Sequence, residues 1–144
     1  MRSPAELADL FRSNGLKMTP QRLCIFGVLH DNVGHPSAEA VHAEARRQMP
    51  MMSLKTVYQT LNDLAEMGEI LQLDLGTGSA RYDPNVEGQH HHLVCTRCAK
   101  VRDVHAAIDV QVPAAKRQGF AVGSAEVIFR GLCAECRADR RAPR

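Results

Sequence analysis

The sequence contains no tryptophan, two tyrosines and four phenylalanines, so aromatic residues make up only 4% of its 144 residues. A small sheet in such a chain gains much of its stability from a bound metal or from dimerisation. The chain also lacks a long hydrophobic run, because its longest apolar stretch, residues 23–29, is far too short to span a bilayer. The N-terminus has no apolar segment of signal-peptide length, and we therefore expect a cytoplasmic protein with no membrane partner.

Neither sign of charge dominates the chain, whose formal net charge is +2. Residues 1–83 hold eight Lys or Arg and ten Asp or Glu, whereas residues 84–144 hold ten and six. If the first half binds nucleic acid, it must therefore use a local patch rather than bulk positive charge. The hydrophobic content of 44% and charged content of 24% are ordinary for a soluble globular protein of one compact domain or two small ones.

Four of the five cysteines form two CxxC pairs, Cys95 with Cys98 and Cys133 with Cys136. Two such pairs supply four thiolates that can converge on one tetrahedral Zn²⁺ ion. In a reducing cytosol this spacing favours metal binding over disulfides. A thiol-disulfide oxidoreductase is the alternative, and it predicts a protein without bound zinc.

A histidine run just before the first CxxC pair indicates a second, different metal site. His90 and His92 are two residues apart, so on a strand they project from the same face. Asp83 and Asp103 flank them in the chain. Imidazoles with carboxylates suit Fe²⁺, Mn²⁺, Ni²⁺ or Zn²⁺. A metalloenzyme with a hydrolytic or oxygenase site is an alternative, although no nucleophile or general base accompanies the cluster.

The first half of the chain predicts four helices followed by a hairpin. Each helix begins after a serine or threonine of N-cap type, and two of these are followed by proline. Residues 70–75 and 79–83 read as two short strands joined by a glycine-rich turn, which together with the helices indicates a winged helix-turn-helix. The four caps are Ser3, Thr19, Ser37 and Ser53.

The fourth helix is the candidate recognition helix. Its apolar stripe leaves Lys55, Tyr58 and Gln59 on the opposite face, where they could reach phosphates and base edges in a major groove. A solvated helix face is the alternative. The neighbouring hairpin and nearby basic residues, which include Lys17 and Arg22, favour DNA binding.

The second half predicts a small mixed domain around the metal ligands. We expect a strand over residues 100–105, a helix within residues 106–118 and a strand pair over residues 120–132 that leads into the second CxxC pair. The fold class is therefore α+β, with an N-terminal winged helix-turn-helix domain and a C-terminal α/β domain that carries a zinc site.

Six segments, taken in order, resemble the ferric uptake regulator family over about residues 5–137. Each motif alone is a weak signal, whereas the ordered set is specific. The segments are LKMTPQR at 16–22, GHPSAEAV at 34–41, SLKTVYQTL at 53–61, RYD at 81–83, HHHLVCTRC at 90–98 and GLCAEC at 131–136.

The resemblance implies a homodimeric, metal-dependent transcriptional regulator that binds a double-stranded DNA operator. Residues 1–83 would form the DNA-binding domain and residues 84–144 the dimerisation domain, with a hinge at about 83–90. By the family pattern Lys17, Tyr58 and Arg22 contact DNA. Structural zinc would bind Cys95, Cys98, Cys133 and Cys136, and the regulatory ion would bind His35, Asp83, His90, His92 and Asp103.

The two aspartates make the chain similar to the peroxide-responsive branch of this family, because the iron-uptake branch typically uses glutamates there. In the peroxide branch Fe²⁺ reacts with H₂O₂ and a ligand histidine gains oxygen, and His35 and His90 occupy the matching positions. Mn²⁺ in the same site is far less reactive. An iron-, zinc- or nickel-responsive regulator of metal uptake on the same scaffold is the alternative.

Overall fold

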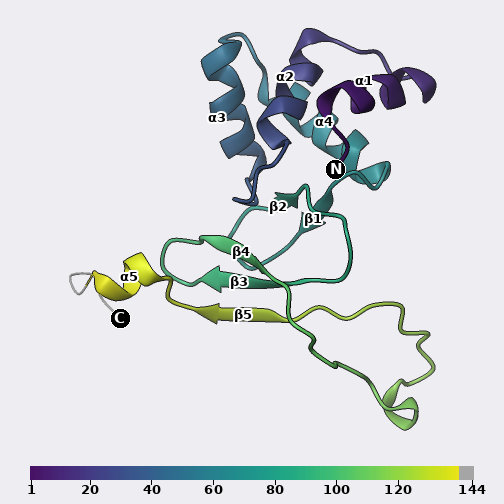
Figure 1. Cartoon of the computed structure of the whole chain (residues 1–144), viewed down its shortest axis with the longest axis vertical. Coiled ribbons are helices and arrows are strands. Elements are labelled where there is room, and N and C mark those ends of the chain that lie inside the picture. Colours follow the sequence, from purple (N-terminus) through teal and green to yellow (C-terminus); the bar gives the residue numbers. More distant parts are fainter. Residues whose placement is uncertain (140–144) are drawn as a thin grey trace. The chain divides into compact units, whose positions relative to one another are not determined.

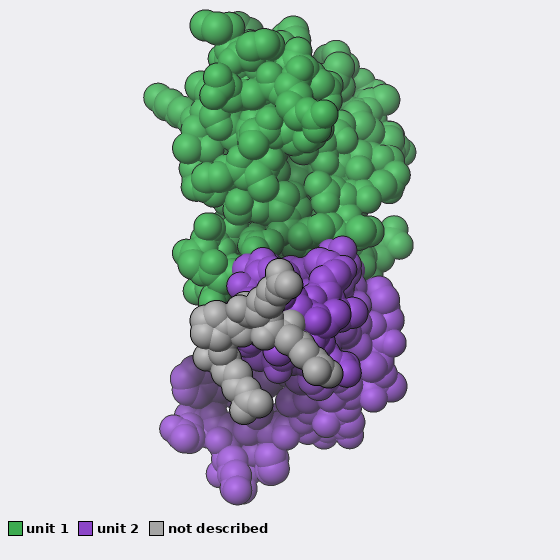
Figure 2. Space-filling model, turned by 90° about the vertical axis from the view of Figure 1, so that its left-hand side faces the viewer, with its two compact units in different colours: residues 1–87 green, residues 88–144 purple. Residues whose placement is uncertain are grey.

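The computed structural model describes residues 1–139. It divides into two compact units, residues 1–87 and the residues from 88 onward (Figure 2). No helix among the described residues is both long enough and apolar enough to cross a membrane.

Four helices make up most of unit 1, and each begins where its cap predicts. The capping hydroxyl in every case accepts a hydrogen bond from the backbone N–H three residues later, which confirms the four predicted starts. Proline at the first helical position adds to the signal in two of them. The helices are α1 (Pro4–Ser13), α2 (Pro20–Leu29), α3 (Ala38–Gln48) and α4 (Leu54–Glu66).

The apolar faces of these helices meet in one core, within which the rings of Phe11 and Phe26 pack edge to face with centroids 4.9 Å apart. The hairpin of β1 (Leu71–Leu73) and β2 (Arg81–Asp83) follows α4, and its strands are antiparallel. Both strands are shorter than predicted because the glycine-containing turn takes up more residues. Helices followed by this hairpin form a winged helix, as the sequence predicts.

Unit 2 is built on a three-stranded sheet (Figure 1). Its strands are β3 (His91–Cys95), β4 (Val101–Val104) and β5 (Ile128–Gly131). The central strand β3 pairs antiparallel with β4 and parallel with β5. A short helix, α5 (Ala134–Ala138), begins at the second CxxC pair. Most of the helical residues lie in unit 1 and the three-stranded sheet lies in unit 2, which confirms the α+β class.

The predicted helix within residues 106–118 is wrong. This segment holds only one 3₁₀ turn, η1 (Ala114–Lys116), and otherwise runs as irregular chain that extends away from the sheet (Figure 1). Pro113 lacks the N–H that a helix interior needs and disfavours helical geometry at Val112. The predicted strand pair over 120–132 is also wrong, since only β5 forms there.

Unit 2 buries little apolar surface among its described residues. Its buried apolar side chains are Val94, Cys95 and Val101. In contrast, Leu93 and Phe129 are neighbours across β3 and β5 and are both exposed. Further exposed apolar residues lie along the chain between β4 and β5 and after β5: Val110, Val112, Phe120, Val122 and Leu132.

Candidate metal centres and nucleic-acid interface

The four CxxC cysteines converge in unit 2, with their sulfur atoms all within 4.8 Å of one another. Cys95 is the last residue of β3 and Cys98 follows it, whereas Cys133 is the N-cap of α5 and Cys136 lies within that helix. The Sγ atoms of Cys98 and Cys133 are 3.7 Å apart. Zinc bound to sulfur at about 2.3 Å in a tetrahedron sets its ligands about 3.8 Å apart. The cluster therefore fits the structural Zn²⁺ that the sequence predicts.

The electrostatics of the cluster also favour a cation. Backbone amides, that of Cys133 first, donate to Cys95 and lower the pKa of its thiol to about 6. Burial and the neighbouring thiol of Cys133 raise the pKa of Cys136 to about 12. Four thiols this close cannot all ionise by themselves because their charges repel. A divalent cation removes this repulsion and binds all four as thiolates.

A second cluster in unit 2 is formed by His90, His92 and Asp103. His92 on β3 is the register partner of Asp103 on β4, so their side chains share one face of the sheet. The Nε2 atoms of His90 and His92 each lie 3.7 Å from Oδ1 of Asp103. The centroids of the two imidazole rings are 4.9 Å apart. The sequence-predicted pair of histidines thus meets one of its two predicted carboxylates.

Glu126 is a member of this cluster that the sequence did not identify. Its Oε1 lies 2.6 Å from Nδ1 of His92, so Nδ1 is the protonated ring nitrogen that donates to the carboxylate. In the neutral imidazole the lone pair is then on Nε2, the atom that faces Asp103. Glu126 lies in irregular chain before β5, and no spacing motif marks it.

In unit 1, His35 and Asp83 form a third group. Nε2 of His35 lies 3.2 Å from Oδ2 of Asp83, and both side chains are buried. Nδ1 of His35 is 3.1 Å from the carbonyl oxygen of Val33, which can only accept, so Nδ1 carries the proton. In its neutral form the ring therefore turns its Nε2 lone pair toward a carboxylate, an arrangement that a metal cation or an added proton stabilises.

The backbone around His35 is held in an uncommon conformation. His35 has a φ of +49°, which is unfavourable for a residue with a Cβ. The Arg81 guanidinium donates to the His35 carbonyl at 2.9 Å, and the Tyr82 amide donates to the Pro36 carbonyl at 3.0 Å. Strand β2 thus fixes His35 at the same time as it places Asp83. The sequence alone does not indicate this role of Arg81, although Arg81 lies in the RYD motif.

Asp83 is itself oriented by the chain that follows it. Its Oδ1 accepts a hydrogen bond of 2.8 Å from the backbone N–H of Asn85, which leaves Oδ2 directed at His35. Imidazole nitrogens and carboxylate oxygens together form a donor set that suits Fe²⁺, Mn²⁺ or Zn²⁺ rather than a soft ion that prefers thiolate ligands. The residues present therefore fit a regulatory metal that differs chemically from the cysteine-bound zinc.

The outer face of α4 carries the predicted DNA-contacting residues. Lys55, Tyr58 and Gln59 are all exposed, whereas Val57 and Leu61 on the opposite face are buried. The Tyr58 hydroxyl donates to Oε1 of Glu39 on α3 at 2.8 Å. This bond raises the pKa of Tyr58 and fixes its ring orientation. Sequence reasoning did not identify Glu39.

The two remaining predicted DNA contacts differ in their surroundings. Lys17 is exposed just before α2. The Arg22 guanidinium instead pairs with Asp63 at 2.7 Å, donates to the Lys17 carbonyl at 2.9 Å and lies 5.2 Å from the centroid of the Phe11 ring. With 12% of its side chain exposed, Arg22 is largely engaged within unit 1, which favours a structural role.

Comparison with known proteins identifies the family of the chain. The model of the ferric uptake regulator family matches residues 13–130. The peroxide operon regulator of Bacillus subtilis strain 168 is 32% identical over 133 residues, which are 91% of this chain and 91% of that protein. The ferric uptake regulation protein of the same strain is 35% identical over 130 residues, covering 86% and 87%.

A solved structure shows the same fold. The ferric uptake regulator of Helicobacter pylori aligns with a TM-score of 0.73 at 24% identity, over 92% of this chain and 90% of that one. The family match spans both units, from α1 to β5. The chain therefore belongs to the ferric uptake regulator family of metal-responsive, DNA-binding transcriptional regulators, and it is not an enzyme.

Proposed function

We propose that this regulator is a repressor that binds a double-stranded DNA operator as a cytoplasmic homodimer and senses peroxide through Fe²⁺ or Mn²⁺. One observation carries the proposal: each of two buried or half-buried aspartates faces a histidine Nε2, at 3.2 Å in unit 1 and 3.7 Å in unit 2. The proposed ligands of the regulatory ion are His35, Asp83, His90, His92 and Asp103.

The carboxylate type supports peroxide sensing over iron sensing, since aspartates at these positions are typical of the peroxide-responsive branch. Fe²⁺ held by these residues would supply the redox chemistry that reduces H₂O₂, whereas Mn²⁺ held there would be far less reactive. The ring of His35 or His90 would then gain one oxygen atom from the peroxide, and the other oxygen would leave as water. A histidine oxidised in this way is a poorer ligand, so the regulatory ion is lost.

The division of ligands between the units supports a switch. His35 and Asp83 belong to unit 1, whereas His90, His92 and Asp103 belong to unit 2, and neither group alone completes a coordination shell. We propose that both groups bind the same ion. An ion shared in this way favours one relative orientation of the units, and it thereby shifts the population toward the form that binds DNA.

The exposed apolar residues of unit 2 support the homodimer. Leu93 and Phe129 lie side by side on the sheet with 48% and 40% of their surface exposed, and Phe120 is 74% exposed. A second copy of the chain would remove this surface from water and add the core that unit 2 lacks. Two recognition helices related by a twofold axis would then read two half-sites of an operator.

Regulation by iron, zinc or nickel level, without peroxide chemistry, is the second candidate. It is favoured by the 35% identity to a ferric uptake regulation protein, which is no lower than the identity to the peroxide operon regulator. Both candidates use the same ligands, the same zinc and the same DNA-binding face. They differ only in the response of the iron-loaded protein to peroxide.

The test begins with a DNA duplex selected from a random pool by the Mn²⁺-loaded protein. Binding to this duplex is measured for the zinc-only, Mn²⁺-loaded and Fe²⁺-loaded forms, before and after a stoichiometric amount of H₂O₂. We expect both loaded forms to bind and only the Fe²⁺ form to lose binding after peroxide. Retention of binding by the Fe²⁺ form would assign the protein to the second candidate.

Single-ligand variants test whether the two groups of ligands serve one ion. His35→Ala in unit 1 and His90→Ala in unit 2 should each abolish binding of the single exchangeable Mn²⁺ ion and leave the zinc content at about one per chain. If each variant instead still bound one of two independent Mn²⁺ ions, the shared ion would be ruled out.

A further inference from the structure

Glu126 lies in an irregular segment that is joined to residues 89–92 by several hydrogen bonds. The Gln89 amide donates from Nε2 to the Ala125 carbonyl at 2.8 Å. The Val127 amide donates to Nδ1 of His91 at 3.1 Å, and the His92 amide donates to the Val127 carbonyl at 3.2 Å. The backbone on both sides of Glu126 is therefore fixed against residues 89–92.

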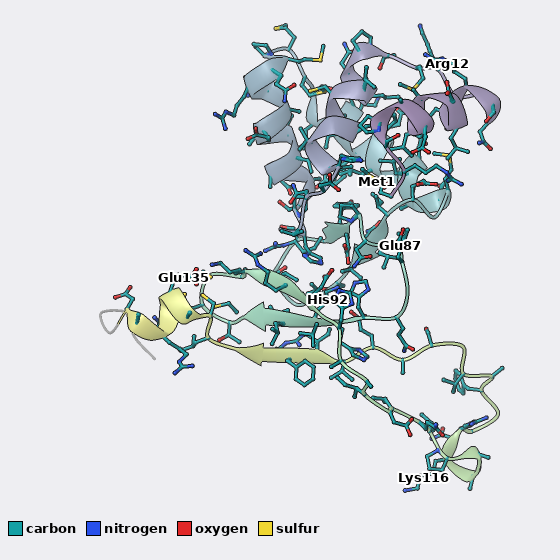
Figure 3. All side chains as sticks on the ribbon, in the orientation of Figure 1. Met1, Arg12, Glu87, His92, Lys116 and Glu135 are labelled. Atoms are coloured by element: carbon teal, nitrogen blue, oxygen red, sulfur yellow. The ribbon has the colours of Figure 1, made fainter. Side chains whose placement is uncertain are left out.

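Within this frame, Glu126 makes a short contact with one proposed metal ligand. Its Oε1 is 2.6 Å from Nδ1 of His92, and the His92 side chain is 2% exposed whereas that of Glu126 is 40% exposed. Figure 3 shows the His92 side chain projecting from β3. A carboxylate can only accept here, so it holds the proton on Nδ1 and directs the Nε2 lone pair to the opposite side of the ring.

The opposite side of the ring is where the other ligands lie. Nε2 of His92 is 3.7 Å from Asp103, which also lies 3.7 Å from Nε2 of His90. A histidine binds a metal through Nε2 only when its ring faces the metal and its proton is on Nδ1. A hydrogen-bond acceptor at Nδ1 provides both conditions, and it also makes Nε2 a stronger electron-pair donor to the metal.

We propose that Glu126 is a positioning residue that orients His92 and fixes its tautomer for the regulatory ion, and so sets the affinity for that ion. The inference rests on the proposed function, because it takes His92 as a ligand. Loss of such an outer carboxylate typically weakens metal binding about 10- to 100-fold. The structural zinc is held by cysteines alone and should not respond.

Two variants separate positioning from other roles. Glu126→Ala removes the acceptor, whereas Glu126→Gln keeps a neutral amide oxygen that can still accept from Nδ1. We expect the dissociation constant for Mn²⁺ to rise about 10- to 100-fold in the alanine variant and less in the glutamine variant. Asp109→Ala, which removes an exposed carboxylate from the same unit, is the matched control and should bind Mn²⁺ like the unaltered chain.

The affinity is read from the electron paramagnetic resonance signal of free Mn²⁺, and the tautomer of His92 from nitrogen-15 chemical shifts of the zinc-only protein. The Nδ1–H form should dominate in the unaltered and glutamine proteins and become mixed in the alanine variant. An unchanged His92 tautomer in Glu126→Ala, or Mn²⁺ affinity within twofold of the unaltered chain, would overturn the inference.

Two further results are informative. Equal loss of Mn²⁺ binding in the glutamine and alanine variants would identify Glu126 as a direct ligand, and this also overturns a positioning role. His92→Ala tests the underlying assignment separately, since it must weaken Mn²⁺ binding more than Glu126→Ala does. If His92→Ala binds Mn²⁺ normally, the proposed regulatory site itself fails, whatever the Glu126 variants show.

Discussion

Removal of the zinc ion should unfold unit 2 while unit 1 stays folded. The buried valines of unit 2 among the described residues, Val94 and Val101, contribute about 1.5–3 kcal/mol each through apolar burial. A structural zinc bound to thiolates contributes about 10–16 kcal/mol to the folding of a small domain. Zinc binding thus stabilises unit 2 more than the burial of its valines does, whereas unit 1 has an extensive core of its own.

Cys98→Ser removes one ligand from the cysteine cluster and tests this expectation. Cys24→Ser, which alters the one cysteine outside the cluster, is the control. Hydrogen exchange followed by mass spectrometry reports the protection of each strand and helix. We expect β3, β4 and β5 to lose protection in Cys98→Ser as zinc is lost, with α1 to α4 unaffected. The Cys24→Ser protein should retain both zinc and protection. Protected β3 to β5 amides in a zinc-free protein would show that unit 2 does not need zinc to fold, because dimerisation alone would then be holding the unit together.

Three further substitutions and one pH titration test individual contacts. Arg81→Gln should weaken Mn²⁺ binding about tenfold at unchanged zinc content, because the His35 carbonyl loses a charged donor worth about 1.5–3 kcal/mol; calorimetric titration measures this, and unchanged affinity would remove Arg81 from the site. Lys55→Ala should lower the salt dependence of operator binding by about one phosphate contact, as measured in binding titrations. Arg22→Met should instead lower the free energy of unfolding of unit 1, as measured in thermal melts. The reverse pattern would contradict both assignments. Zinc affinity should fall more steeply with each pH unit below about 6 than above it. The reason is that Cys95, whose thiol has a pKa of about 6, is protonated below that pH and must release a proton to bind zinc. A competition titration with a chelator measures this, and it would show no such steepening if Cys95 is not a ligand.

Local signals were enough to predict unit 1 from sequence. N-caps such as Ser53 and the glycine after α4 act within a few residues, so the helix limits follow from short-range hydrogen bonds and φ preferences. The cysteine cluster was equally accessible, since a CxxC pair closes on one metal through local geometry and needs only one long-range pairing, of β3 with β5.

The errors and the omissions have different causes. The expected helix in residues 106–118 rests on pattern alone, and Pro113 and the β-branched residues around it oppose a helix. Glu126 and Glu39 act through contacts with residues 34 and 19 positions away in the chain. No motif marks such residues, because their partners are set by the tertiary fold rather than by spacing.

Peroxide sensing at His35 and His90 is tested most directly by site-resolved mass spectrometry of the iron-loaded protein, combined with DNA binding on the same sample. The protein is loaded with Fe²⁺ without oxygen, treated with one equivalent of H₂O₂, and digested, with the Mn²⁺-loaded form as control. We predict that peptides with His35 or His90 gain one oxygen atom in the iron form alone, in proportion to the operator binding lost. Loss of binding with oxidation confined to the cysteines, or histidine oxidation without loss of binding, would contradict peroxide sensing at these histidines.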